Sequence, residues 1–242
     1  MKKVLHDLDG VHALWQDGDA FLSGTDAVLL AGAVSCRPDE TGCELGTGCG
    51  MATLLLAIHK PFRRVYAVER APDALALAAE NFGMNGFADR LVPVAGDLRR
   101  VSLPEKCDFV FSNPPYRRRD QGRSENAARD GALFEGPGGV EAVCKAASAL
   151  LRGKGRLYLI WPVERLAAVF SALEKTDLEA KEMIPVIPVR GRAAKWALLC
   201  ARKGAKPGLT CRPAFVLKEK NGADTPEAAR LFGAGVIEEE EA

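Results

Sequence analysis

The sequence lacks the long apolar runs and leader segments that mark membrane and secreted proteins. Its longest apolar stretch, residues 51–58, is far shorter than the roughly 20 residues that span a bilayer. The first nine residues include two lysines, two aspartates and a histidine, so they do not form the apolar core of a signal peptide. We therefore expect a cytoplasmic protein with no membrane partner.

Metal-binding patterns are also scarce. None of the seven cysteines has Cys-x-x-Cys spacing to another, and the three histidines, at positions 6, 12 and 59, are not clustered. These patterns predict neither a zinc site nor a disulfide framework, because both need closely spaced ligand or thiol pairs. We expect scattered, reduced thiols and no metal.

The net charge is also small, at +1 for the whole chain. A total this small gives no sign of a nucleic-acid partner, but it averages over unlike regions. Residues 1–112 carry −4, residues 113–180 carry +2, residues 181–220 carry +8 and residues 221–242 carry −5. The basic region is therefore a candidate for contact with phosphates, although runs of charge are often only solvated surface.

The chain does contain alternating short apolar runs and helical patterns. Strands are expected at 41–45, 64–69, 91–95, 108–112, 156–161, 180–189 and 195–202, and helices at 51–59, 73–81, 140–151 and 163–175. This alternation predicts an α/β fold with a mostly parallel, seven-stranded sheet and helices on both faces. We expect one domain, 1–203, made of an N-terminal segment (1–40) over the ligand site and a core (41–203). A C-terminal extension, 204–242, would follow it, with a short helix capped by Thr225 and begun by Pro226.

A glycine-rich segment follows the first expected strand, where residues 44–50 read Glu-Leu-Gly-Thr-Gly-Cys-Gly. Glycine is needed where the backbone turns sharply and a ligand must approach without a Cβ in the way. Glu69 ends the next expected strand, where a carboxylate accepts hydrogen bonds from ribose hydroxyls. The spacing Gly-x-Gly-x-Gly predicts a nucleoside cofactor rather than a pyrophosphate dinucleotide. Asp97, after the third expected strand, would contact an adenine amine or else serve as a turn or cap residue.

The most informative segment, Ser112 to Tyr116, reads Ser-Asn-Pro-Pro-Tyr and ends the fourth expected strand. In open α/β sheets, ligands bind at the carboxyl ends of strands near the point where strand order reverses. Asn113 offers a side-chain carbonyl, Pro114 a backbone carbonyl and Tyr116 a planar face. Two acceptors can hold the two hydrogens of a planar NH₂ group while its base stacks on the ring. These three residues are the predicted catalytic set.

This arrangement suits attack by a conjugated amine on an electrophilic methyl group. The lone pair of such an amine is delocalised, and acceptors placed for an sp³ nitrogen favour the transition state. No histidine base is needed, since the proton becomes acidic after transfer, and no histidine follows position 59. The alternative is structural: the prolines end a strand and Tyr116 packs in the core.

In this order, the glycine turn, Glu69, Gly96-Asp97 and Asn-Pro-Pro-Tyr resemble the Rossmann-like class I S-adenosylmethionine-dependent methyltransferases that modify planar amino groups. The segment Gly-Thr-Asp-Ala-Val-Leu-Leu at 24–30 looks like that of the bacterial tRNA(Val) anticodon-loop adenine-N6 methyltransferase family. The similarity runs from about residue 15 to 203. It implies S-adenosyl-L-methionine as cofactor and, as substrate, adenine 37, which adjoins the anticodon on its 3′ side.

The resemblance also implies roles for individual residues. Asn113, Pro114 and Tyr116 would hold the target amine, and Thr25 and Asp26 would close over the cofactor. The residues expected to bind the cofactor are Thr25, Asp26, Glu44, Gly46, Thr47, Gly48, Glu69, Asp97, Leu98 and Asn113. RNA, with tRNA favoured, is the expected partner. Independently of the resemblance, the charge of a cluster of arginines after Tyr116 makes it a candidate for contact with RNA phosphates, or else solvated surface: Arg117, Arg118, Arg119, Arg123 and Arg129.

Two other functions stay open. The first is N5-methylation of a glutamine in a release factor or another protein, since those enzymes also use Asn-Pro-Pro-Tyr. They generally carry a helical substrate domain ahead of the glycine turn, whereas only 43 residues precede Glu44 here. The second is a non-enzymatic RNA-binding protein with a methyltransferase fold. The presence of the expected site residues Glu44, Glu69 and Asn113 argues against this second function. A DNA or ribosomal RNA substrate would use the same base pocket.

Overall fold

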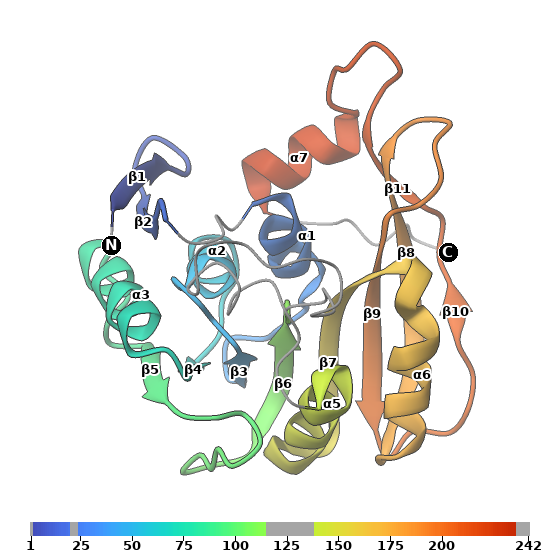
Figure 1. The fold of residues 1–242 in the computed structure, drawn as a ribbon, viewed down its shortest axis with the longest axis horizontal. Coiled ribbons are helices and arrows are strands. Elements are labelled where there is room, and N and C mark those ends of the chain that lie inside the picture. The colour runs from blue at the N-terminus through green and yellow to red at the C-terminus, as the bar shows by residue number, and fades with distance from the viewer. Residues whose placement is uncertain (1, 20–23, 115–137, 236–242) are drawn as a thin grey trace.

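The computed structural model describes residues 2–19, 24–114 and 138–235, and its centre is a nine-stranded sheet (Figure 1). In spatial order the first strands are β5 (Leu91–Ala95), β4 (Arg64–Glu69), β3 (Thr41–Leu45), β6 (Cys107–Ser112), β7 (Leu151–Pro162), β9 (Trp196–Lys203) and β8 (Leu178–Val189). Two short strands, β10 (Thr210–Cys211) and β11 (Phe215–Lys218), both pair with β8. Only β9 runs antiparallel to its neighbours.

The Rossmann-like, mostly parallel sheet predicted from the sequence is confirmed, and all seven expected strands belong to it. The chain builds β3, β4 and β5 outward on one side and then returns to place β6 and β7 on the other, so strand order reverses at β3. The expected number of strands was two too small. Strands β10 and β11 have two and four residues, which is too short for an alternating pattern to indicate a strand.

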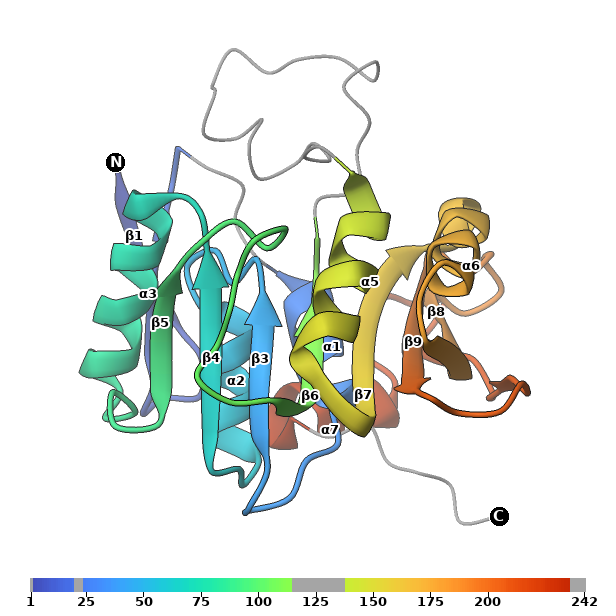
Figure 2. The same cartoon turned by 90° about the horizontal axis from the view of Figure 1, so that it is seen from below.

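Helices cover both faces of the sheet, as predicted (Figure 2). One face carries α1 (Thr25–Ala33), α2 (Met51–His59), α3 (Pro72–Met84) and α7 (Pro226–Ala234). The other carries α5 (Gly139–Leu150) and, after a short 3₁₀ turn at Val163–Arg165, α6 (Leu166–Glu174). Because both faces are covered, every residue of β3 and the four central residues of β4 are buried.

The N-terminal segment contains a hairpin that the sequence did not predict. Strands β1 (Lys3–Asp7) and β2 (Ala13–Asp17) pair with each other in a separate two-stranded sheet. Two asparagines of α3 bind its backbone. Asn81 Oδ1 accepts from the N–H of Trp15 at 2.8 Å, and Asn85 Oδ1 accepts from that of Ala13 at 3.0 Å. An isolated hairpin is marginally stable, so these contacts with α3 hold it in place.

Helix α1 was also missed, although it lies directly before the core. Six of its nine residues are buried, so it shows little of the polar and apolar alternation that indicates a surface helix. Its carboxyl end is fixed by Lys60, whose Nζ donates to the carbonyls of Ala31, Gly32 and Val34 at 3.0, 2.7 and 2.5 Å. These bonds satisfy backbone acceptors that the helix leaves open.

Helix α7 begins as predicted. Thr225 is its cap, with Oγ1 accepting from the N–H of Ala228 at 3.1 Å, and Pro226 is its first residue. The helix packs on α1 and against the face of the sheet that carries α1 and α2.

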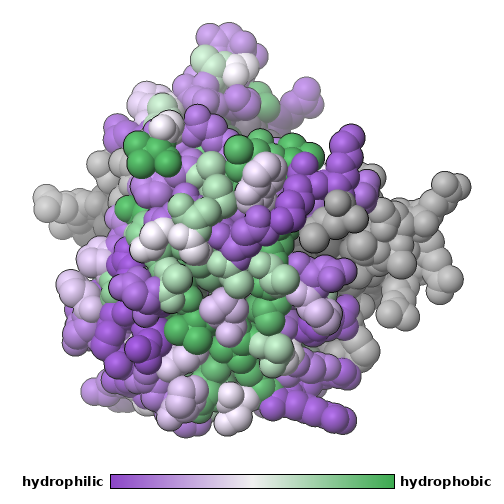
Figure 3. Space-filling model, turned by 90° about the vertical axis from the view of Figure 1, so that its left-hand side faces the viewer, coloured by the Kyte–Doolittle hydropathy of each residue, from purple (hydrophilic) through white to green (hydrophobic). Residues whose placement is uncertain are grey.

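Figure 3 looks onto the side of the molecule where Figure 1 has β1, β2 and α3, and apolar patches are interspersed there among polar ones. Exposed apolar side chains on these elements and the hairpin turn include Leu5, Val11 and Met84. Within the described ranges, none of the helices has the length and apolar character that crossing a membrane requires.

Candidate active site

Four strands end side by side at one edge of the sheet, where their carboxyl ends carry the predicted site residues. Leu45 of β3 pairs with Val68 of β4, and Glu69 pairs with Ala95 of β5. On the other side of β3, Glu44 pairs with Phe111 of β6, two residues before Asn113. The glycine turn, Glu69, Asp97 and Asn113 therefore meet at the point where strand order reverses, which is the usual ligand site of such sheets.

The glycine turn between β3 and α2 has left-handed backbone at all three glycines, with φ of 78° at Gly46, 57° at Gly48 and 86° at Gly50. A Cβ at Gly50 would lie 2.6 Å from the ring of Phe82, so this glycine allows α2 and α3 to pack closely. A Cβ at Gly46 or Gly48 would meet no atom within 4 Å. These two glycines therefore border open space at the edge of the sheet, where a ligand can approach the backbone.

Glu44 holds the turn from inside. Its carboxylate is almost fully buried, and Oε2 accepts from the hydroxyls of Thr47 and Thr53, each at 2.5 Å. Thr47 belongs to the turn and Thr53 to α2, so one carboxylate joins the two. Burial raises the pKa of Glu44 to about 7, although both hydroxyls favour the charged form. Glu44 and Thr47, both predicted to bind a cofactor, thus bind each other.

Glu44→Gln is expected to remove a pH dependence of stability. The pKa of Glu44 in the folded protein is about 7, above its ordinary value of 4.5. Below pH 4 the acid is protonated in both the folded and the unfolded state, so the free energy of unfolding is at its full value. It falls as the pH rises through 7, because the folded state must then ionise a buried group. The loss amounts to about 1–3 kcal/mol. Urea unfolding at pH 5 and pH 8 would measure it, and an equal pH dependence in wild type and variant would contradict the expectation.

Glu69 accepts three backbone hydrogen bonds at the end of β4. Oε1 accepts from the N–H groups of Arg70 and Ala71 at 2.8 and 2.9 Å, and Oε2 accepts from that of Gly48 at 3.0 Å. A carboxylate has about four acceptor positions, so one remains for a hydroxyl. The contact with Gly48 also fixes the distance between the carboxylate and the glycine turn.

Asp97 is the turn residue that one interpretation of the sequence expected. Its carboxylate accepts from the backbone N–H of Arg99 at 3.0 Å and from Arg99 Nε at 2.9 Å. The guanidinium of Arg99 lowers the pKa of Asp97 well below its usual range. The neighbouring N–H of Gly96 donates to the carbonyl of Glu69 at 3.0 Å, which places Asp97 beside the end of β4. Leu98 packs against the hydrophobic core between the sheet and helices α5 and α6.

Asn113 lies directly after β6, and its side-chain amide is bonded on one side only. Nδ2 donates to Asp26 Oδ2 at 3.1 Å, while Oδ1 is buried and has no hydrogen-bond partner among the described residues. Ser112 Oγ donates to the carbonyl of Leu45 at 2.6 Å and so fixes the end of β6 to β3. Pro114 is buried. An unpaired buried acceptor is costly, which makes Oδ1 a candidate for binding a donor from a substrate.

Some predicted residues are exposed or lie outside the described residues. Thr25 is the exposed first residue of α1, whereas Asp26 is buried and contacts Asn113. Tyr116 and the arginine cluster (Arg117, Arg118, Arg119, Arg123 and Arg129) lie outside the described residues. The contact between Asp26 and Asn113 was not predicted, although a single carboxylate inside an otherwise apolar helix was a sign that it has a polar partner.

A second group of basic residues lies at the same edge of the sheet. β8 runs parallel to β7 and β6, so the β8–β9 turn at 190–195 and the turn after β11 follow carboxyl ends on this edge. Arg190 Nε and Nη2 donate to both oxygens of Glu219 at 2.7 and 2.8 Å, which joins the two turns. The exposed side chains of Arg192 and Lys220 form no ion pair within the described ranges. By strand pairing, the β8–β9 turn lies three strands from β6 and the turn after β11 lies four strands from it.

Comparison with known proteins identifies the family. The model of the TRM5/TYW2 methyltransferase domain matches residues 33–132. The tRNA1(Val) (adenine(37)-N6)-methyltransferase of Tolumonas auensis is 29% identical over 217 residues, 89% of this chain and 90% of the relative. Its namesake from Actinobacillus succinogenes is 30% identical over 198 residues, 78% and 80% of the two chains. The chain belongs to this tRNA1(Val) (adenine(37)-N6)-methyltransferase family.

Membership makes the chain a class I S-adenosylmethionine-dependent N-methyltransferase. A predicted O-methyltransferase from Agrobacterium tumefaciens shares the fold, with a TM-score of 0.72 at 24% identity over 88% of this chain and 98% of the other. Another relative differs in named activity. A release factor glutamine methyltransferase from Cereibacter sphaeroides is 32% identical over 173 residues, which is 67% of this chain and 61% of that protein.

The edge of the sheet fits the family's cofactor. Gly46 and Gly48 leave open space where a Cβ would otherwise stand, and Glu69 keeps an acceptor position for a hydroxyl beside them. No group of three or more potential metal ligands occurs among the histidines, cysteines and acids that the structure describes.

Proposed function

We propose that this methyltransferase transfers a methyl group to the N6 amine of adenine 37 in the anticodon loop of tRNA1(Val). The single observation that carries the proposal is Asn113 Oδ1, a buried acceptor without a partner at the carboxyl end of β6. Asn113 follows β6 and Glu69 ends β4, and between these two strands lies β3, which leads into the glycine turn. The two named tRNA methyltransferases, each similar over more than three quarters of this chain, supply the nucleoside and its position.

In this proposal the chain's own residues bind and orient the amine. Bound S-adenosylmethionine supplies an electrophilic methyl group, and the glycine turn and Glu69 hold its nucleoside part. Asn113 Oδ1 accepts a hydrogen bond from the N6 amine, and the Pro114 carbonyl accepts a second one. Two acceptors on the amine hydrogens stabilise positive charge as nitrogen becomes sp³, so they favour the transition state over the planar ground state. Tyr116 would stack on the base and limit its orientation.

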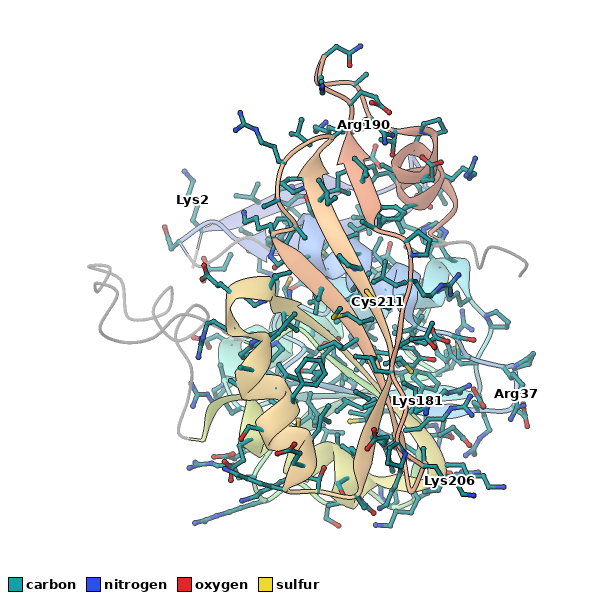
Figure 4. All side chains as sticks on the ribbon, turned by 90° about the vertical axis from the view of Figure 1, so that its right-hand side faces the viewer. Lys2, Arg37, Lys181, Arg190, Lys206 and Cys211 are labelled. Carbon is teal, nitrogen blue, oxygen red and sulfur yellow. The ribbon has the colours of Figure 1, made fainter. Side chains whose placement is uncertain are left out.

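The basic turns between β8 and β9 (190–195) and after β11 (219–223) support RNA as the substrate class. They lie at the edge that carries Asn113, and they carry Arg192 and Lys220 without ion pairs among the described residues. Figure 4 shows that the basic segment is not one patch, because Arg190 lies at one end of β8 whereas Lys181 and Lys206 lie toward the other. In this proposal the Arg190 end, which lies at the edge of the sheet that carries Asn113, contacts the RNA phosphates.

Arg192→Ala with Lys220→Ala is expected to weaken RNA binding and to reduce its dependence on salt. Losing two phosphate contacts should lower the slope of log Kd against log salt by about 1–2. Titration of labelled tRNA at several salt concentrations would measure both quantities. The matched control is Lys181→Ala with Lys206→Ala, which removes the same charge from the same segment at the other end of β8. Equal effects of the two double variants would contradict the proposed surface.

The function itself is tested with purified protein, labelled S-adenosylmethionine and tRNA1(Val) that lacks the modification. We expect label in the tRNA, and nucleoside mass spectrometry should identify N6-methyladenosine at position 37. Replacing that adenine with guanine should abolish labelling. The assay also includes release factor, because a glutamine methyltransferase is among the relatives. Label in the release factor with inert tRNA would overturn the proposal in favour of protein methylation.

A further inference from the structure

We propose that Asp26 is a positioning residue that fixes the amide of Asn113 with its oxygen toward the target amine. The inference rests on the proposed function, in which Asn113 binds that amine. It deepens the function by assigning a task to helix α1, which precedes the Rossmann-like core. The resemblance noted from the sequence implied a different task for Asp26, namely closing over the cofactor.

The hydrogen bond between the two side chains determines which way the amide faces. An asparagine amide has a donor side and an acceptor side of nearly equal shape, so its orientation is set by its partners. An ionised carboxylate only accepts. Asn113 Nδ2 therefore faces Asp26 Oδ2, at 3.1 Å, and Oδ1 is left buried without a partner among the described residues. The opposite orientation would bring two oxygens together and present an NH₂ group to the substrate's NH₂ group.

Asp26 can do this because it stands on a rigid element. The residue is only 7% exposed and lies in the first turn of α1, which packs against α2 and the sheet. The far end of α1 is fixed by Lys60, which donates to three of its last carbonyls. Asn113 is equally restrained, since it follows Ser112, whose hydroxyl is bonded to the carbonyl of Leu45 on β3 at 2.6 Å. The acceptor is thus oriented before the substrate binds.

Exchange of the two groups provides the test. Asp26→Asn removes the carboxylate that selects the orientation, so kcat should fall by about 10- to 100-fold. Asn113→Asp places two carboxylates face to face and should lose at least as much. In the double variant Asp26→Asn, Asn113→Asp, the amide at 26 donates to one oxygen at 113 and leaves the other to accept from the amine. We expect its kcat within about tenfold of wild type and above both single variants. All three changes keep the side-chain size.

The readouts separate positioning from a general structural effect. Melting temperature, cofactor Kd and KM for tRNA should change little in Asp26→Asn, while kcat falls. Wild-type kcat in Asp26→Asn would overturn the proposal, and so would a double variant no better than its worse parent. A large loss of cofactor affinity in Asp26→Asn with kcat retained would also overturn it, and would support the role of closing over the cofactor.

The wild-type reaction on tRNA is measured first, which separates this proposal from the proposed function. If wild type methylates release factor instead, the proposed function fails. The same four proteins are then compared on that glutamine amide, whose planar NH₂ group would take the place of the adenine amine at Asn113. The expected order of kcat is unchanged there, and loss of that order would overturn the role of Asp26 independently of the substrate.

Discussion

Asn113→Ala is expected to lower kcat for methyl transfer by about 10²- to 10³-fold, the usual cost of losing one positioned polar group in an active site. The variant removes the unpartnered oxygen at the carboxyl end of β6 and leaves the glycine turn, Glu44 and Glu69 unchanged. Cofactor affinity should therefore fall much less than kcat, because the other residues expected to bind the cofactor are unchanged. Single-turnover kinetics with saturating tRNA would measure the chemical step, and calorimetry would measure the cofactor Kd.

The matched control is Asn221→Ala, which removes an exposed asparagine whose side chain accepts only from the N–H of Ala223 in the turn after β11. At saturating tRNA its kcat should stay within about twofold of wild type, because surface changes of this kind have small effects. If Asn113→Ala kept wild-type kcat, the predicted catalytic segment would have only the structural role of ending a strand.

Gly48→Asn is expected to weaken cofactor binding by about 100-fold or more while the fold is retained. Asparagine tolerates left-handed backbone better than other side chains, and φ at Gly48 is 57°, so the strain is small. A Cβ there meets no protein atom within 4 Å, so the new side chain occupies the open space next to Glu69. A cofactor that needs this space would overlap the new side chain, and its backbone contacts at the turn would be lost. Calorimetric titration of the cofactor would measure the effect.

Gly204→Asn is the control for backbone strain. Gly204 also has left-handed backbone, with φ of 67°, and open space around its Cβ position, but it lies in the turn after β9. Both variants should lower the melting temperature by similar small amounts, and only Gly48→Asn should lose cofactor affinity. Equal affinities in the two variants would show that the space beside Gly48 is not used by the cofactor.

The sequence by itself determined seven of the nine strands of the sheet and the edge at which the site lies. Buried parallel strands are often continuous apolar runs, so β4, with Val-Tyr-Ala-Val at its centre, could be recognised from composition. The turn residues after β3, β4, β5 and β6 could then be assigned to one edge. The glycine turn and Asn-Pro-Pro-Tyr are local motifs whose spacing carries their chemistry. Each depends on neighbours within a few residues, which is why no tertiary structure was needed to find them.

Tertiary structure alone decided how the site residues are held. Asp26 and Asn113 are 87 residues apart, and no local pattern links a carboxylate on α1 to an amide after β6. Nor did the motif reveal that Glu44 accepts from the hydroxyls of Thr47 and Thr53. The sequence showed only the net charge of residues 181–220, which is +8. Its division between the two ends of β8, with Arg190 at one end and Lys181 and Lys206 toward the other, follows from the direction of β8. Side-chain contacts between distant elements are set by packing of the whole sheet, whereas motifs and strands are set by residues close in sequence.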